Sequence, residues 1–457
     1  MIFVEKRLDG RDESSATLRR APLVKGFPVL ESAPGLLGDP LQFMRDAYLR
    51  YGSIFRVRAL NREYTVLAGV EANRFVAGEG KHCFSVESFW GKVGEHMGCP
   101  HMVAMVDGDI HKYQRKVMAP LLAQQAFSEQ IPRMADNVDS VLNQALGSRQ
   151  QKVDHLMRLM VSNQLSELLL GRKASADHVK AMIYAFNMVT RVYAIRSMPQ
   201  AMLYSPRVQW AKWITNRELR LTLKRSRRRQ AAGGTGYLEH ILAALDARPD
   251  WFGEGDKLGH ALLPYVAALD TIASTKGFML RRLLADPALY RCVQQEVDQA
   301  FAGGIPDLET LKAMASLNGL CREVMRLEPA AFGMLRSAAC DFAFKGYHVS
   351  AGDELMVFTT ADHMNPEFFP DPYCFDMTRY SAPRLEHKQS AYAPFGKGPH
   401  NCLGASLTEL ILPLHMGVLL HRVLVKPACD LNKVRMVFRP APVLSENFKV
   451  SLSRRRP

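Results

Sequence analysis

Residues 393–404 read APFGKGPHNCLG and are the most informative stretch of this chain. Two glycines and two prolines precede Cys402, a third glycine follows it, and a helix-forming run extends over about 403–423. Glycines in such a loop let the backbone approach a flat ligand closely. The helix N-terminus beside Cys402 favours a negatively charged thiolate, which is the form that binds metals. Cys402 is therefore a candidate metal ligand.

Zinc is one metal to consider, with His400 as a neighbouring second ligand. One residue between two ligands is too few, and no second Cys/His pair in the sequence stands at zinc-like spacing. The eight cysteines are scattered singly along 457 residues, in a chain too long to depend on a disulfide framework. The pattern disfavours zinc, and it predicts a reducing, cytoplasmic location.

The loop resembles the haem-binding loop of the cytochrome P450 family, whose pattern is Phe-x-x-Gly-x-x-x-Cys-x-Gly. The matching residues are Phe395, Gly398, Cys402 and Gly404. The resemblance implies haem b as the cofactor, with Cys402 as the thiolate ligand of its iron and Phe395 in the cofactor-binding loop. A thiolate ligand pushes electron density to the iron and favours cleavage of the O–O bond.

Four further residues match the family's partners for the haem propionates. His111 and Arg115 lie one helical turn apart. Arg336 and His400 match two more of these partners. Cationic or hydrogen-bonding groups are what two buried carboxylates require, although each residue taken alone is more consistent with a basic residue on the surface. In sequence order with Cys402, the four together favour a propionate site.

A charged pair matches the family's support for the haem-side loop. Glu323 and Arg326 are three residues apart and share one helix face, a spacing that is also common between surface neighbours. In the family such a pair joins a downstream arginine, and Arg379 in the segment 372–380 matches it. Met377 stands where the family often has proline.

One long, largely apolar helix is expected over about 257–285, and a helix that is apolar all round is a buried one. It contains Asp270 and Thr271 side by side. A buried acid costs free energy unless it is paired, so Asp270 is either a functional group or half of a buried ion pair. Thr271 can donate a hydrogen bond to the carbonyl of Ala267 and bend the helix.

The family carries an acid–threonine pair at this position over the haem iron. The resemblance assigns proton management to Asp270 and Thr271, and places Ala267 among the cofactor-binding residues. Ala268 stands where the family usually has glycine, and Ile272 where it often has a second threonine or serine. Pro264 removes a helix hydrogen bond and is expected to kink the helix.

The rest of the chain predicts one mainly α domain with a small β-rich lobe. Residues 1–34 are expected to form an N-terminal extension, and 35–457 a single catalytic domain with β-rich parts at about 52–69, 342–360 and 434–452. The resemblance spans about 35–452. It implies the cytochrome P450 fold, with haem between the long distal helix and the cysteine loop. The match is to bacterial-type members that lack a membrane anchor, and no stretch is long and apolar enough to span a membrane.

The net charge of +14 is compatible with several kinds of partner. A nucleic-acid-binding or scaffold protein is disfavoured, because the dense basic run at 224–229 lacks interleaved aromatics and is expected to be a solvated connection between helices. With the resemblance, the charge favours an acidic ferredoxin or flavodoxin, with its reductase, as electron donor on the Cys402 face. Lys397 is the expected exposed basic residue nearest the haem.

The expected activity is a haem-thiolate monooxygenase that inserts one atom of dioxygen into an apolar small molecule. A peroxide-using or rearranging enzyme of the same fold is the alternative; it would keep Cys402 but would not need the Asp270–Thr271 pair. By family position, the substrate pocket draws on Phe89, Trp90, Val93, Met97, Ala331, Leu335 and Phe448. Terpenoid, fatty-acyl, polyketide and peptide substrates all suit such a lining.

Overall fold

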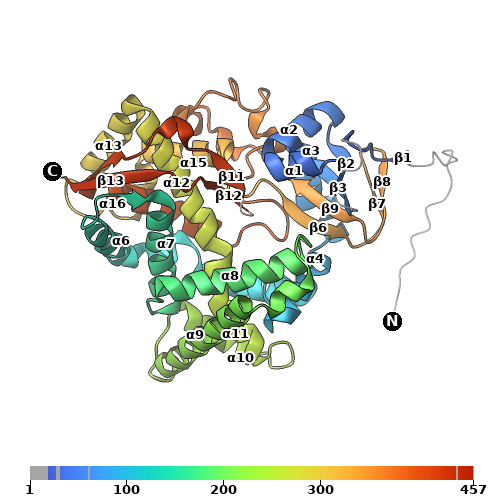
Figure 1. Ribbon diagram of the computed structural model, residues 1–457, viewed down its shortest axis with the longest axis horizontal. Helices are drawn as coiled ribbons and strands as arrows, with labels where there is room; N and C mark the ends of the chain where they lie inside the picture. Colours follow the sequence, from blue (N-terminus) through green and yellow to red (C-terminus); the bar gives the residue numbers. More distant parts are fainter. Residues whose placement is uncertain (1–18, 27–30, 60–61, 439–440, 456–457) are drawn as a thin grey trace.

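The computed structural model describes residues 19–26, 31–59, 62–438 and 441–455. The molecule is roughly triangular in outline, with helices forming most of it and a strand-rich lobe at one corner (Figure 1). Strands from both halves of the chain lie side by side in that lobe. The mainly helical fold with a small β-rich portion is as expected from the sequence.

The helices occupy most of the described chain. Their bounds are α1 (Ala33–Gly38), α2 (Pro40–Tyr51), α3 (Gly69–Ala77), α4 (Glu87–Met97), α5 (Gly108–Leu121), α6 (Ile131–Ala145), α7 (Val153–Leu170), α8 (Ala176–Tyr193), α9 (Pro206–Ala231), α10 (Tyr237–Asp246), α11 (Glu254–Pro264), α12 (Asp270–Ala285), α13 (Pro287–Phe301), α14 (Leu308–Ala313), α15 (Ala315–Leu327) and α16 (Ala405–Arg422). Helices α6, α7, α12, α13, α15 and α16 share one large hydrophobic core.

The strands form small sheets. Their bounds are β1 (Arg19–Arg20), β2 (Ile54–Ala59), β3 (Arg62–Ala68), β4 (Phe84–Ser85), β5 (Gln151–Lys152), β6 (Met334–Ala338), β7 (Phe342–Phe344), β8 (Tyr347–Val349), β9 (Glu354–Phe358), β10 (Val423–Pro427), β11 (Met436–Phe438), β12 (Pro442–Leu444) and β13 (Lys449–Arg454). The largest sheet has the order β2-β3-β9-β6-β4, in which only β3 and β9 run parallel.

The expected hairpin is present as β2 and β3, with Ile54 opposite Leu67. Its turn at residues 60–61 lies outside the described residues. The folded part reaches further toward the N-terminus than residue 35, because β1 pairs with β8 and the amide of Val24 donates to the carbonyl of Arg56 at 2.8 Å. Residues 1–18 and 27–30 of the expected extension are not among those described.

The sequence had indicated that the basic run at 224–229 connects two helices, and this prediction is wrong. It forms the last turns of α9. Carboxylates of α10 neutralise part of its charge, since Arg229 pairs with Glu239 at 2.6 Å and Arg227 pairs with Asp246. Arginine is also a good helix former, so the segment continues the helix.

The expected distal helix is interrupted. Helix α11 ends at Pro264, a π-helical turn η4 (Tyr265–Leu269) follows, and α12 begins at Asp270. Proline has no backbone N–H and clashes with the carbonyl four residues back, so the regular α-helical ladder fails here. The kink expected at Pro264 therefore takes the form of a π turn directly before the Asp270–Thr271 pair.

None of the described helices is both long enough and apolar enough to cross a membrane.

Candidate haem site

The cysteine loop is tightly held by its backbone. Gly396 and Gly398 adopt φ angles of 72° and 83°, where residues with side chains are strained. A Cβ at Gly398 would lie 2.7 Å from the carbonyl oxygen of Val76, and one at Gly396 would lie 2.8 Å from the sulfur of Met334. The amide of Cys402 donates to the carbonyl of Phe395 at 2.8 Å. Only glycines therefore fit these two positions.

The thiol of Cys402 experiences opposing influences. Cys402 is exposed at its surface, yet the protein atoms around it raise the pKa of the thiol, whereas a hydrogen bond from the Gly404 amide and the nearby Arg115 guanidinium lower it. Helix α16 starts at Ala405, slightly later than expected. The amide beside the sulfur therefore belongs to the N-cap residue, and the net pKa shift is opposite to that expected from the helix N-terminus alone.

Two of the expected propionate partners are buried donors with few partners of their own. His111 is 4% exposed, and its Nε2 has no hydrogen-bond partner among the described residues. Arg336 is 8% exposed, and its guanidinium donates to the carbonyl of Leu335 at 2.7 Å and to the sulfur of Met334 at 3.4 Å; within the part of the chain that the structure describes, it donates to no carboxylate. Burial lowers the pKa of Arg336 to about 10. Buried donors of this kind fit the carboxylates of a haem group.

The other two propionate candidates contact the loop or its neighbours. The rings of His111 and His400 stack with centroids 3.8 Å apart, and His400 Nε2 lies 2.7 Å from Asp107 Oδ1. Arg115 donates to the carbonyl of Asn401 at 2.9 Å and to its side-chain oxygen at 2.6 Å. Sequence reasoning missed Asp107 and Asn401, since neither belongs to the quoted motif positions.

Lys397 differs from expectation. It is half-buried and not exposed. Burial also lowers the pKa of its ammonium group.

The distal helix is accessible to solvent at Ala267, which the sequence analysis placed among the cofactor-binding residues. Ala267 is exposed although Tyr265 and Leu269 around it are buried. Thr271 Oγ1 lies 3.1 Å from the carbonyl oxygen of Ala268 and 3.4 Å from that of Ala267, as back-bonding predicts. A flat cofactor needs such an open stretch of small side chains, so this helix and the cysteine loop are suited to hold haem.

Asp270 is half-buried, less than the sequence had indicated, and it forms an ion pair with Arg158 of α7, so its charge has a partner. Arg158 Nε also lies 2.9 Å from both carboxylate oxygens of Asp154. Burial lowers the pKa of Arg158, but the carboxylates of Asp270 and Asp154 raise it by more, so the net shift of this pKa is upward. Sequence reasoning missed Arg158 and Asp154, because nothing in their local pattern distinguishes them from an ordinary i, i+4 surface pair.

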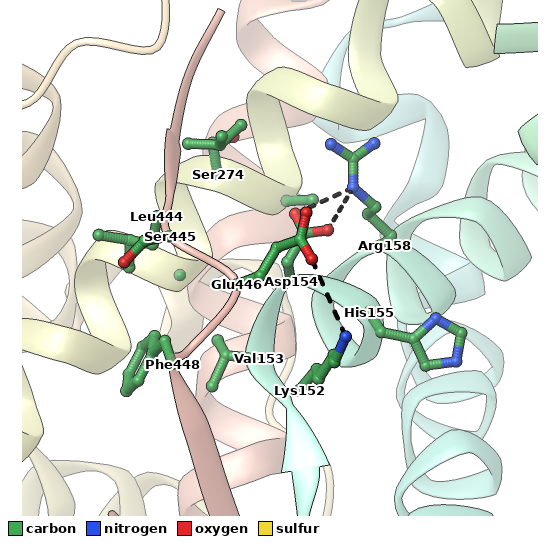
Figure 2. Close-up of a pocket in the computed structure, with 13 residues that line it drawn as sticks. Lys152, Val153, Asp154, His155, Arg158, Ser274, Leu444, Ser445, Glu446 and Phe448 are labelled. Carbon is green, nitrogen blue, oxygen red and sulfur yellow. Dashed lines mark hydrogen bonds and ion pairs between the residues drawn. The ribbon is translucent and has the colours of Figure 1, made fainter. Parts of the chain in front are cut away.

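A hollow of about 390 Å³ lies beside this ion-pair chain, between the start of α7, α12 and the turn from β12 to β13. Figure 2 shows Arg158 and Asp154 on one side of it and Phe448 on the other. Phe448 is buried, and its carbonyl accepts from the amide of Val153 at 3.1 Å. The structure thus places Phe448 in the wall of this hollow.

The remaining pocket candidates cluster around α4. Phe89 and Val93 are buried, and Trp90 and Met97 are half-buried. The ring of Phe89 stacks on Tyr64 at 6.3 Å, and the other three pack with residues of α8. Leu335 is half-buried in β6, which contacts α4, and Ala331 is exposed just before that strand. These six residues therefore lie on adjoining elements.

The charged support of the loop is fully buried. Arg326 binds both carboxylate oxygens of Glu323 at 2.7 and 2.8 Å, and Arg379 Nε lies 3.3 Å from the same carboxylate. Arg326 also donates to the carbonyl of His363 at 2.7 Å, and His363 Nε2 accepts from the amide of Ala393 at 3.0 Å. His363, which sequence reasoning missed, thus links the charged pair to the start of the cysteine loop.

We expect Glu323→Gln to destabilise the fold by about 3–5 kcal/mol, because it removes the counter-charge of buried Arg326 and one of the two carboxylates beside buried Arg379. Urea unfolding monitored by circular dichroism measures this change. The matched control is Glu309→Gln on α14, where an exposed pair with Lys312 at 2.9 Å should contribute less than about 1 kcal/mol. Equal effects of the two substitutions would contradict a structural role for Glu323.

Comparisons with known proteins agree with this site. A family model for cytochrome P450 matches residues 22–446. A putative cytochrome P450 136 of Mycobacterium tuberculosis is 27% identical, covering 72% of this chain and 67% of its own length. The cyclooctat-9-en-7-ol 5-monooxygenase of Streptomyces melanosporofaciens is 26% identical over 67% of this chain and 69% of its own.

The solved structure of retinoic acid bound cyanobacterial CYP120A1 has the same fold. It superposes with a TM-score of 0.78 over 96% of this chain and 100% of the other, at 22% identity. The chain belongs to the cytochrome P450 family of monooxygenases, oxidoreductases whose cofactor is a thiolate-ligated haem.

Proposed function

We propose that this enzyme inserts one oxygen atom of dioxygen into an apolar small molecule, using two electrons from a redox partner. The observation that carries the proposal is the arrangement around η4 and the start of α12. Thr271 lies beside the accessible Ala267, and Asp270 is tied to Arg158. A peroxide-using or rearranging enzyme would have no use for this acid–alcohol pair.

The proposed roles of the residues follow from their contacts. Haem, held through the Cys402 thiolate, supplies the activation of dioxygen when bound. His111, Arg115, Arg336 and His400 would bind its propionates, and Phe395 and Ala267 would line its two sides. Glu323, Arg326 and Arg379 hold the loop that carries Cys402.

Proton supply would run through the distal helix. Thr271 Oγ1 holds a proton close to the accessible face at Ala267. The Asp270 carboxylate, next to it in the chain, lines a second hollow together with Asp154 and Arg158. Such a hollow would let the carboxylate exchange protons with the solvent side, while Thr271 would hold a proton on the side of the helix where Ala267 is accessible.

The substrate is proposed to be largely hydrocarbon, in secondary metabolism or in lipid or terpenoid oxidation. Two observations support this class. The residues of α4 pack among apolar side chains, and the names of two similar proteins refer to cyclooctat-9-en-7-ol and to retinoic acid. We further propose a cytoplasmic location, which the eight free cysteines support.

Turnover under labelled dioxygen tests the reaction type. With a substrate found by its shift of the haem absorption spectrum, the product should gain one ¹⁸O atom from ¹⁸O₂ and none from H₂¹⁸O. The control is the same reaction in ¹⁶O₂ with labelled water. Product that forms equally well without dioxygen would favour the rearranging alternative.

An acidic ferredoxin or flavodoxin is the proposed electron donor, because basic residues outnumber acidic ones by 59 to 45. The rate of reduction by such a donor should fall as salt rises, since the Debye length shrinks from about 10 Å at 0.1 M to about 3 Å at 1 M. Reduction by an uncharged chemical mediator serves as the control. Salt-independent reduction by every acidic donor tried would contradict the proposal.

A further inference from the structure

Three side chains with metal-binding atoms meet at the edge of the strand-rich lobe, away from the cysteine loop. His82 and Cys83 end the short helix η1 (Glu79–Cys83), and Cys340 follows β6. His82 and Cys83 are adjacent in the sequence, a closer spacing than zinc ligands usually have. One ligand atom from each of the three residues nevertheless lies within 4.8 Å of the other two. His82 is exposed, Cys340 is half-buried and Cys83 is buried, and both cysteines are free thiols.

The backbone holds these residues in place from both sides. Strands β4 and β6 pair antiparallel, with Phe84 opposite Ala338. The amide of Ala339 extends the pairing by donating to the carbonyl of Cys83 at 2.8 Å. The two cysteines are therefore on neighbouring, hydrogen-bonded segments, although 257 positions separate them in the sequence. This arrangement exists before any ligand binds.

An aromatic wall stands next to the cluster. The ring of Phe84 lies 6.0 Å from that of Phe75 and 5.6 Å from that of Phe342, which belongs to the strand after Cys340. Phe84 is next to Cys83 in the chain and Phe342 lies two residues after Cys340, so apolar rings flank both cysteines, whereas His82 is exposed. Such asymmetry is suited to a metal ion that keeps one open position.

We propose that His82, Cys83 and Cys340 form a zinc site with one further position open to water. Two thiolates and one imidazole are typical zinc ligands, at distances of about 2.3 Å for sulfur and about 2.0 Å for nitrogen. In a tetrahedral site these atoms are about 3.4–3.8 Å apart, so the cluster closes with a small side-chain movement. Binding displaces the two thiol protons to the buffer, and no oxidation or reduction takes place.

A disulfide between Cys83 and Cys340 is the competing use of the two thiols. The position of His82 favours the metal, because a disulfide would gain nothing from a third ligand atom within the same small distance. The site is separate from Cys402 and does not depend on the proposed reaction. It would tie η1 and the segment leading into α4 to β6, the strand that carries Arg336.

Zinc titration of the reduced, haem-loaded protein against a chromophoric chelator tests the proposal. We expect one tight site per chain. His82→Ala and Cys340→Ser should each weaken zinc binding by about 100-fold or more, since even loss of an outer-shell partner costs about 10–100-fold. The exposed cysteines Cys292 and Cys374 supply the matched controls, and Cys292→Ser and Cys374→Ser should leave zinc affinity unchanged.

X-ray absorption at the zinc edge then identifies the ligands. We expect two sulfur atoms at about 2.3 Å and one nitrogen at about 2.0 Å, with one sulfur lost in Cys340→Ser. An unaltered haem spectrum in each variant shows that the fold is intact. Equal zinc affinity in the wild-type protein and Cys340→Ser would overturn the proposal, as would a Cys83–Cys340 disulfide in a protein that binds no zinc after reduction.

Discussion

Cys402→His should abolish the strongly red-shifted Soret band that we expect from the reduced, carbon monoxide-bound protein. That band depends on a thiolate ligand, and Cys402 is the cysteine in the glycine-rich loop whose backbone is fixed by its bond to Phe395. Activity with dioxygen should fall to background, because an imidazole does not push electron density to the iron as a thiolate does. Difference spectroscopy with carbon monoxide measures the band directly.

Cys374→Ser is the control for this substitution, since Cys374 is an exposed free thiol outside the loop. It should keep the red-shifted band at full intensity. If the wild-type protein binds haem but shows only the band of histidine ligation, the assignment of Cys402 is wrong.

Thr271→Ala should leave haem content and substrate binding nearly intact, while product formed per reductant consumed falls and hydrogen peroxide rises. The reason is that the hydroxyl on the accessible side of the helix, beside Ala267, is lost. Thr271→Ser keeps a hydroxyl and should restore much of the coupling. The control is Thr275→Ala, one turn further along α12, whose hydroxyl lies 2.9 Å from the carbonyl oxygen of Thr271.

Asp270→Asn should instead slow turnover by about 10²–10⁴-fold, the range typical of lost acid–base assistance. Asparagine is similar in size but cannot exchange a proton with the solvent side or neutralise Arg158. Measuring both the rate and the hydrogen peroxide yield separates proton supply from proton positioning. Full coupling in Thr271→Ala would show that this hydroxyl only bends the helix, and would favour the peroxide-using or rearranging alternative.

The parts that the sequence predicted well are those with a local pattern. The glycine-rich loop before Cys402 can be recognised from the sequence alone, and the structure gives both Gly396 and Gly398 positive φ angles. Helical spacing likewise predicts that Glu323 and Arg326 share one helix face, and the two side chains pair there; their full burial does not follow from the spacing. Both patterns depend on neighbours within a few residues.

The parts that the sequence did not predict depend on contacts between distant segments. Arg158 is 112 positions from Asp270, and Asp107 is 293 positions from His400. The sequence suggested that the run at 224–229 is a solvated connection, because the run itself contains no acidic residue. The carboxylates that neutralise part of its charge come from α10. Nothing in one sequence alone reveals such partners.

The π turn at Tyr265–Leu269 fixes the rotational phase of everything that follows it in α12. A π turn closes its hydrogen bond one residue later than an α turn, and each residue of an α-helix rotates the chain by about 100°. Deleting one residue from the turn would therefore rotate Asp270 and Thr271 by about a quarter turn relative to α11. Arg158 would then face a different side chain, and the hydroxyl of Thr271 would leave the side on which Ala267 is accessible. The length of this segment is thus under tighter constraint than its composition, and homologous helices should differ here by substitution far more readily than by insertion or deletion.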